Sequence, residues 1–186
     1  GVLSMTYRSE GPSMPRRPVK RGRPCCLLLA AVFMTISCQT GALFSVTGKQ
    51  ARADNRFQLE EGGPHLAHWE SPDLMLDYEY DKSPDQLIMR GHVTLQNKNA
   101  KFPSVKHMRV MIHFLDADGF ILGSGTVWNA GRWVPMILVN WNFERAWPLP
   151  QDATKIAFSY DGTVGEQGQR HGDDGGGVDW DFWRGP

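Results

Sequence analysis

Cysteine is missing from most of the chain. Cys25, Cys26 and Cys38 all lie within the first 38 of the 186 residues. The rest of the sequence therefore cannot form a disulfide framework, a zinc site built on cysteine or a dithiol redox pair. The absence is compatible with an oxidising compartment.

The short motifs of several enzyme classes are also missing. The sequence has no phosphate-binding P-loop and no dinucleotide fingerprint. Gly123-Ser124-Gly125 does not match the G-x-S-x-G nucleophile elbow, and no histidine can be assigned to Ser124 from the sequence. The carboxylates are too dispersed to nominate an acid–base pair. These absences predict a non-enzymatic protein without a cofactor.

The net charge of zero conceals an asymmetry along the chain. Six Lys/Arg and one Asp/Glu precede Cys38, whereas 14 Lys/Arg and 19 Asp/Glu follow from Cys38 onward, a net charge of −5. An acidic domain offers no electrostatic attraction to a phosphate backbone, so nucleic acid is not expected among the partners.

The first 53 residues have the pattern of an export leader. Met14 is followed by the basic run Pro15-Arg16-Arg17-Pro18-Val19-Lys20-Arg21-Gly22-Arg23, and residues 24–48 then carry no charge. A basic flank before an apolar stretch is typical of a secretory signal. We therefore expect a helical leader at 1–53 and an exported protein, located in the periplasm or at the periphery of the outer membrane.

Three endings of this leader remain open. Ala51-Arg52-Ala53 before Asp54 has the small-x-small pattern of a signal-peptidase site. Thr35-Ile36-Ser37-Cys38 resembles a lipobox, in which Cys38 would be lipidated. The 20 uncharged residues 27–46 are long enough to span a bilayer without any cleavage.

The remainder reads as one β-rich domain between two irregular segments. Polar, Gly- and Pro-containing residues 54–72 predict a linker, and 73–161 contain strands with apolar residues at every second position. The expected strands are 74–80, 86–96, 105–115, 120–128, 133–143 and 155–160. Turn residues between them predict an all-β fold, an antiparallel immunoglobulin-like sandwich of about six to eight strands.

Residues 162–186 form a Gly- and Asp-rich tail with an aromatic terminus. Trp180, Phe182 and Trp183 fall within four residues. Because large aromatic side chains are costly to leave in water, we expect them to dock on the domain as a final strand. Anchoring a partner is the alternative.

Three segments carry a resemblance to a known family. They are Gly91-His92-Val93-Thr94-Leu95-Gln96-Asn97, the apolar residues 110–115, and Asp116-Ala117-Asp118-Gly119. This part of the chain, 87–160, resembles FxLyC-type and related immunoglobulin-like domains of bacterial envelope proteins. The resemblance implies a β-sandwich without known catalytic residues.

Two sets of side chains are candidates for binding. His92, His107 and His113 are expected on the outward faces of neighbouring strands, where three imidazoles form a metal site only if the strand register brings them together; no bound metal is expected. Aromatic residues form the second set, as a binding surface or as core: Trp128, Trp133, Trp141, Trp180, Phe182 and Trp183.

These observations together favour an interaction or accessory module. Its expected partner is another envelope protein, with membrane contact through the leader if that segment is uncleaved or lipidated. A carbohydrate-binding module that stacks exposed Trp rings on sugars is the alternative. A hydrolase whose site assembles from distant residues is a further alternative.

Overall fold

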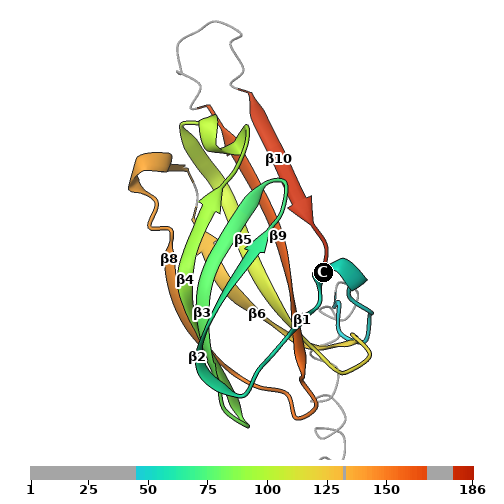
Figure 1. Ribbon diagram of the computed structural model, residues 1–186. Coiled ribbons are helices and arrows are strands. Elements are labelled where there is room, and N and C mark those ends of the chain that lie inside the picture. The colour runs from blue at the N-terminus through green and yellow to red at the C-terminus, as the bar shows by residue number, and fades with distance from the viewer. Residues whose placement is uncertain (1–44, 132, 167–177) are drawn as a thin grey trace, which may run out of the picture. The chain divides into compact units, whose positions relative to one another are not determined.

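The computed structural model describes residues 45–131, 133–166 and 178–186 (Figure 1). Contacts divide the chain into Gly1–Phe44 and Ser45–Pro186, and only the second unit is described below. Residues 1–44 of the predicted leader, among them Cys38, and tail residues 167–177 lie outside the described residues. Within the described ranges, no helix has the length and apolar character needed to cross a membrane.

The described residues are mostly strand, so the all-β prediction is confirmed. One-turn 3-10 helices occur at η3 (Ala53–Asn55), η4 (Asn99–Lys101) and η5 (Met136–Leu138). The strands are β1 (Phe57–Gln58), β2 (Gly62–Glu70), β3 (Leu74–Lys82), β4 (Gln86–Leu95), β5 (Ser104–Leu115), β6 (Ile121–Ala130), β7 (Val134–Pro135), β8 (Asn142–Pro148), β9 (Lys155–Gly165) and β10 (Asp179–Arg184).

These strands form two antiparallel sheets. The four-stranded sheet has the order β2-β3-β4-β8. The six-stranded sheet has the order β1-β9-β5-β6, with β10 also pairing with β9 and β7 with β5. The chain therefore changes sheet between β1 and β2, between β4 and β5, between β7 and β8, and between β8 and β9.

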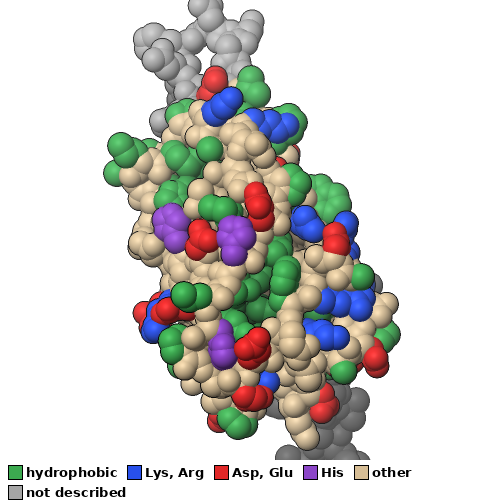
Figure 2. Space-filling view, viewed as in Figure 1, with side chains coloured by type: hydrophobic (Ala, Val, Ile, Leu, Met, Phe, Trp, Pro, Cys, Tyr) green, Lys and Arg blue, Asp and Glu red, His purple; other side chains and the backbone are tan. Residues whose placement is uncertain are grey.

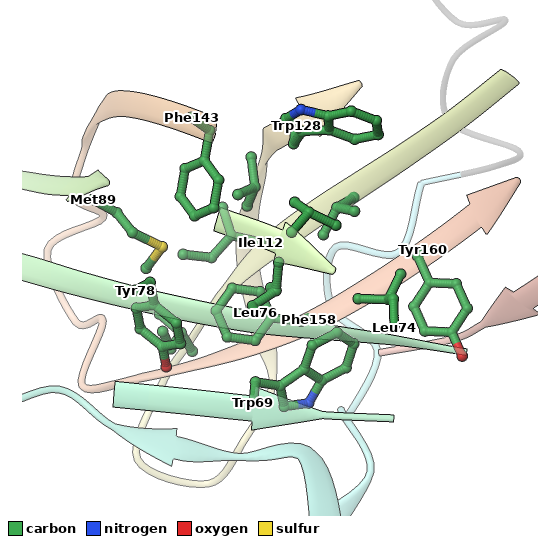
Figure 3. Packing of buried hydrophobic residues seen from close by; sticks show 14 of the residues in the cluster. Trp69, Leu74, Leu76, Tyr78, Met89, Ile112, Trp128, Phe143, Phe158 and Tyr160 are labelled. Atoms are coloured by element: carbon green, nitrogen blue, oxygen red, sulfur yellow. The ribbon is translucent and has the colours of Figure 1, made fainter. Parts of the chain in front are cut away.

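A single apolar core joins the two sheets. The ring centroid of Phe158 in β9 lies 5.2 Å from that of Trp69 in β2 and 5.4 Å from that of Tyr78 in β3 (Figure 3). Leu74 and Leu76 of β3 are fully buried between the sheets. Each large apolar side chain removed from water contributes about 1.5–3 kcal/mol, which is why the period-two pattern selects this packing.

The prediction of a linker at 54–72 is wrong, because this segment contains η3, β1 and β2. The apolar alternation is weak in β2, whose inward positions include His65 and the small Ala67, with only Trp69 fully buried. Asn55 is also buried: its Nδ2 donates to the Phe158 carbonyl at 2.6 Å, and its Oδ1 accepts from Trp69 Nε1 at 3.1 Å. The Asn55 side chain thus takes the place of the backbone hydrogen bonds that a paired strand would make at this point.

The apolar run 133–143 is not the single strand that its pattern predicts. Pro135 ends β7, and η5 follows with Val139 N donating to the Met136 carbonyl at 3.3 Å. Ile137 and Leu138 are exposed rather than in phase with a core. Proline removes a backbone donor and fixes φ, so an apolar pattern alone does not continue the strand through it.

The terminal aromatic segment forms β10, as the sequence favoured. Its residues pair with β9 from Asp179 opposite Gly165 to Arg184 opposite Tyr160. Phe182 is 4% exposed and packs on Tyr160, with ring centroids 5.9 Å apart. Burial of this ring explains why the segment returns to the sheet.

Candidate functional site

The three histidines considered as a candidate metal site do not come together. His92 lies in β4 of the four-stranded sheet, whereas His107 and His113 lie in β5 of the six-stranded sheet. The prediction treated β4 and β5 as neighbours, but the chain changes sheet between them. Among the residues that the structure describes, no three His, Cys, Asp or Glu side chains are grouped to hold a metal ion.

His113 instead bridges three strands of one sheet. Its Nδ1 lies 2.7 Å from Ser124 Oγ in β6, and its Nε2 lies 2.7 Å from Ser159 Oγ in β9. Burial lowers the pKa of His113 to about 4, so the ring is neutral at pH 7. One ring nitrogen then donates to a hydroxyl while the other accepts from one.

This bridge supplies the partner for Ser124 that the sequence could not assign. The strand register brings the two side chains together, because His113 lies opposite Ser124 in β6 and opposite Ala157 in β9. A side chain with a pKa of about 4 is a weak general base at neutral pH. These contacts fit a buried structural hydrogen-bond network between β5, β6 and β9 better than they fit a nucleophilic site.

Two of the aromatic candidates, Trp128 and Phe182, belong to the core, and a third, Trp141, is partly buried against it. Trp128 is 4% exposed, stacks on Trp141 with centroids 5.0 Å apart and planes at 13°, and donates from Nε1 to the Asn140 carbonyl at 2.8 Å. Phe182 packs over Gly162, where a Cβ atom would lie 2.6 Å from the ring. Neither side chain presents a ring to solvent for stacking on a sugar.

The remaining aromatic candidates are exposed to different degrees. Trp133 has Lys106 Nζ 4.2 Å from its ring centroid, and Trp180 has Lys98 Nζ 2.9 Å from its centroid. An ammonium group therefore occupies one face of each ring. Trp183 is 76% exposed on the outer edge of β10. Lys106 and Lys98 thus leave Trp133 and Trp180 one ring face each, at most, for stacking on a sugar.

Several exposed apolar residues lie near one end of the six-stranded sheet. Ile137 and Leu138, in η5, are 90% and 71% exposed. Pro135 pairs with Ser104, Ser104 with Gly165, and Gly165 with Asp179, so one row across the sheet joins β7 to the start of β10. We call this surface the apolar end: Trp133, Ile137, Leu138, Val178 and Trp180.

A second feature is a groove of about 610 Å³ where the two sheets separate. Figure 2 shows apolar side chains at the bottom of a hollow on this face of the molecule. We call it the seam groove, and its principal lining residues are Phe57, Glu60, His65, Ala67, Tyr78, Tyr80 and Ile156. The volume falls within the range of ligand sites, although nothing in the sequence indicated it.

Contacts within the seam groove hold its walls in place. The Tyr80 hydroxyl accepts from the Glu60 backbone N–H at 3.1 Å, and the His65 ring lies 5.0 Å from the Tyr80 ring. Burial raises the pKa of Tyr78 above its ordinary value, so that phenol is neutral. The floor at Tyr78 and Tyr80 is therefore aromatic and uncharged, whereas Arg56 and Glu60 add one charge of each sign to the lining of the groove.

The residues of the predicted cleavage motif are built into the folded domain. Ala51 is 2% exposed and packs in a cluster with Leu115, Ile121 and Ala157. Its backbone N–H donates to the Gly119 carbonyl at 2.9 Å. Ala53 begins η3.

The segment before the motif is held in the same way. Gly48 N donates to the Ile121 carbonyl at 2.8 Å, and Ile121 N donates to the Lys49 carbonyl at 2.9 Å. Arg56 donates to the Ala51 carbonyl from Nε at 3.0 Å and from Nη2 at 2.6 Å. The hydrogen bond from Arg52 lowers the pKa of Asp54. Residues 48–54 thus behave as part of the domain and not as a free linker.

No family model, curated protein or solved structure matches this chain. The resemblance to FxLyC-type domains therefore stays a prediction. Function has to be inferred from the exposed surfaces and from the strand order.

Proposed function

We propose that this protein is an exported, non-catalytic interaction module with an immunoglobulin-like fold. The strand order supports the fold: β3-β4-β8 corresponds to strands A, B and E, and β10-β9-β5-β6 to strands G, F, C and C′. In this comparison β2 is an additional strand beside strand A. Immunoglobulin-like sandwiches serve many functions, so the surfaces have to supply the argument for binding.

The observation that carries the proposal is the apolar end. Ile137 and Leu138 are 90% and 71% exposed, and Val178 is 59% exposed on the same end of the sheet. Large apolar side chains left this exposed near one another support an interaction surface at this end. Trp133 and Trp180 add aromatic rings, which are enriched at protein–protein interfaces. The expected partner is another protein of the cell envelope.

Site-specific photo-cross-linking in the producing cell tests this function. A photoreactive residue at Ile137 should give one discrete adduct, and Leu138→Ser in the same chain should remove it. Glu144, exposed on β8 of the other sheet, is the control position. Identical adducts at both positions, or none at Ile137, would contradict the proposal.

We also propose that the protein is exported, and the structure limits where its leader can be cleaved. Residues 48–53 contribute backbone hydrogen bonds and the buried Ala51, so we infer that the mature chain keeps them. Processing or lipidation would then lie before Ser45, and Cys38 remains a candidate. Intact mass and N-terminal analysis of the exported protein test this inference. A mature chain that begins at Asp54 would contradict it.

A further inference from the structure

We propose that the outer edge of β2, together with the seam groove, binds an extended peptide strand with basic residues supplied by a partner protein. The inference rests on the proposed function and names a second surface that serves it. In this binding mode the peptide pairs with a free sheet edge, and alternate side chains enter pockets beside it.

The edges of the two sheets differ in how they are protected. Charged side chains interrupt β8 at Glu144 and Arg145, and β10 at Asp179, Asp181 and Arg184. At β6, the start of the edge is covered by backbone bonds between Ile121 and residues 48–49. Charged residues and covering segments are the usual means by which proteins block unwanted strand pairing.

β2 lacks this protection over its central part. Residues 65–69, between Pro64 and Glu70, include no Lys, Arg, Asp or Glu. Leu66 is 84% exposed. Among the described strands, only β3 pairs with β2, so the other edge keeps its backbone donors and acceptors free. Five residues offer about 17 Å of edge for a peptide.

The seam groove lies beside this edge and is suited to alternate side chains of such a peptide. Ala67 is small and stands between the larger His65 and Trp69 on the inward side of β2. The space left by Ala67 adjoins Tyr78 and Tyr80 on the groove floor. An apolar peptide side chain at every second position would contact this floor, while the intervening ones would face solvent.

Charge favours a basic partner over a second copy of this chain. Glu60 and Glu61 precede β2, and Glu70 ends it. Glu61 is paired with Lys82, whereas Glu60 and Glu70 have no Lys or Arg partner among the described residues: they approach His65 and His68, at 3.6 and 3.9 Å, and Glu70 also accepts from Gln96 Nε2 at 3.1 Å. Two copies joined along β2 would bring these glutamates near one another. A peptide with Lys or Arg at its ends would instead neutralise them.

Selection from a phage-displayed library of random heptapeptides tests the proposal. The bait is the full chain in detergent micelles, and the best peptide is then synthesised for affinity measurement. We expect enrichment of peptides that alternate apolar and polar residues and carry a terminal Lys or Arg. Leu66→Lys should weaken binding at least tenfold, because it adds a charge on the edge and repels the basic peptide.

Two further variants test whether peptide binding depends on the seam groove and not on another sheet edge. Ala67→Phe, which fills the groove, should also weaken the peptide at least tenfold, whereas Glu144→Lys on the β8 edge should leave binding unchanged. Circular dichroism verifies that each variant is folded. No enrichment, equal binding to the Leu66→Lys variant, or a dimer that Leu66→Lys dissociates would each overturn the proposal. If the adduct at Ile137 persists in the Leu66→Lys variant, the proposed function survives such a failure.

Discussion

The outer faces of the two sheets come from the same alternating sequence pattern, but they differ in how far their side chains are exposed to water. On the four-stranded sheet, His68, Asp77, His92 and Asn142 form one exposed row across β2, β3, β4 and β8, and Figure 2 shows histidine and carboxylate side chains at this surface. On the six-stranded sheet, His113 is 3% exposed. Outward position in a strand therefore does not by itself imply exposure.

The difference arises partly from a chain segment that lies on only one of the sheets. Ala51, with Val46 beside it, packs on Leu115, Ile121 and Ala157 of the six-stranded sheet. This second apolar cluster gives that sheet a partly buried outer face. The four-stranded sheet has its polar row instead, and its ionic contacts are exposed to water.

Removing the residues before Asp54, which pack on the outer face of the six-stranded sheet, should have the largest effect on the free energy of unfolding. A chain starting at Asp54 loses Ala51 and exposes Leu115, Ile121 and Ala157, so we expect a loss of about 3–5 kcal/mol in the free energy of unfolding. Urea unfolding measures it, with a chain starting at Ser45 as the control. Equal midpoints for the two chains would show that the segment contributes no stability.

The two histidines on opposite sheets form a matched pair for a smaller test. His113→Ala removes a buried ring and leaves Ser124 and Ser159 without their partner, which should cost about 3 kcal/mol. His92→Ala, on the exposed row, should cost less than about 0.5 kcal/mol. Urea midpoints of both variants provide the comparison, and similar losses would remove the distinction between the faces.

Acid should weaken the protein through His113. Its pKa is about 4 in the folded chain, below the ordinary histidine value of 6.5, so the unfolded chain takes up a proton first as pH falls. The stability from the neutral ring is complete above the unfolded pKa and decreases from about pH 6.5 toward pH 4. Linkage gives a loss of about 2 kcal/mol between pH 7 and pH 5.

Unfolding curves recorded at several pH values in parallel for the parent and for His113→Gln measure this dependence. The variant lacks the titrating ring, and its stability should change less over the same interval. A parent and variant with parallel pH profiles would assign the acid sensitivity to other groups.

A small effect is also expected for the ion pair on the exposed row. His68 Nδ1 lies 2.7 Å from Asp77 Oδ1, but the two side chains are 48% and 59% exposed. Solvent screens such a pair, so Asp77→Asn should change the free energy of unfolding by less than about 1 kcal/mol. A larger change in the thermal midpoint would mean that the polar row contributes more than a solvated surface does.

Local sequence pattern was sufficient where the structure depends on near neighbours. Strands β3, β4 and β5 begin and end within two residues of the predicted bounds. The β5–β6 turn also follows its sequence: Asp116 Oδ1 accepts from Asp118 N at 2.9 Å and Phe120 N at 2.8 Å, and Gly119 takes φ 89°. Asp, with glycine at a positive φ, is the usual chemistry of such turns.

The candidate sites were less predictable because they depend on contacts between distant residues. The seam groove requires β1 and β2, in a segment whose polar composition predicted a linker. The Ser124–His113–Ser159 bridge needs the register of three strands. Neither arrangement leaves a signal in one stretch of sequence, because a side chain's partners across a sheet are fixed only when the strands pair.

The sequence by itself determined the secondary-structure type, the positions of several strands and the chemistry of the β5–β6 turn, since these follow from period-two alternation and backbone preferences. Only the tertiary structure decided which sheet each strand joins. That choice separated His92 from His113, buried Trp128 and included Ala51 in the domain. The physical reason is that alternation defines an apolar face for each strand, while the strand that covers this face is selected by packing across the whole chain.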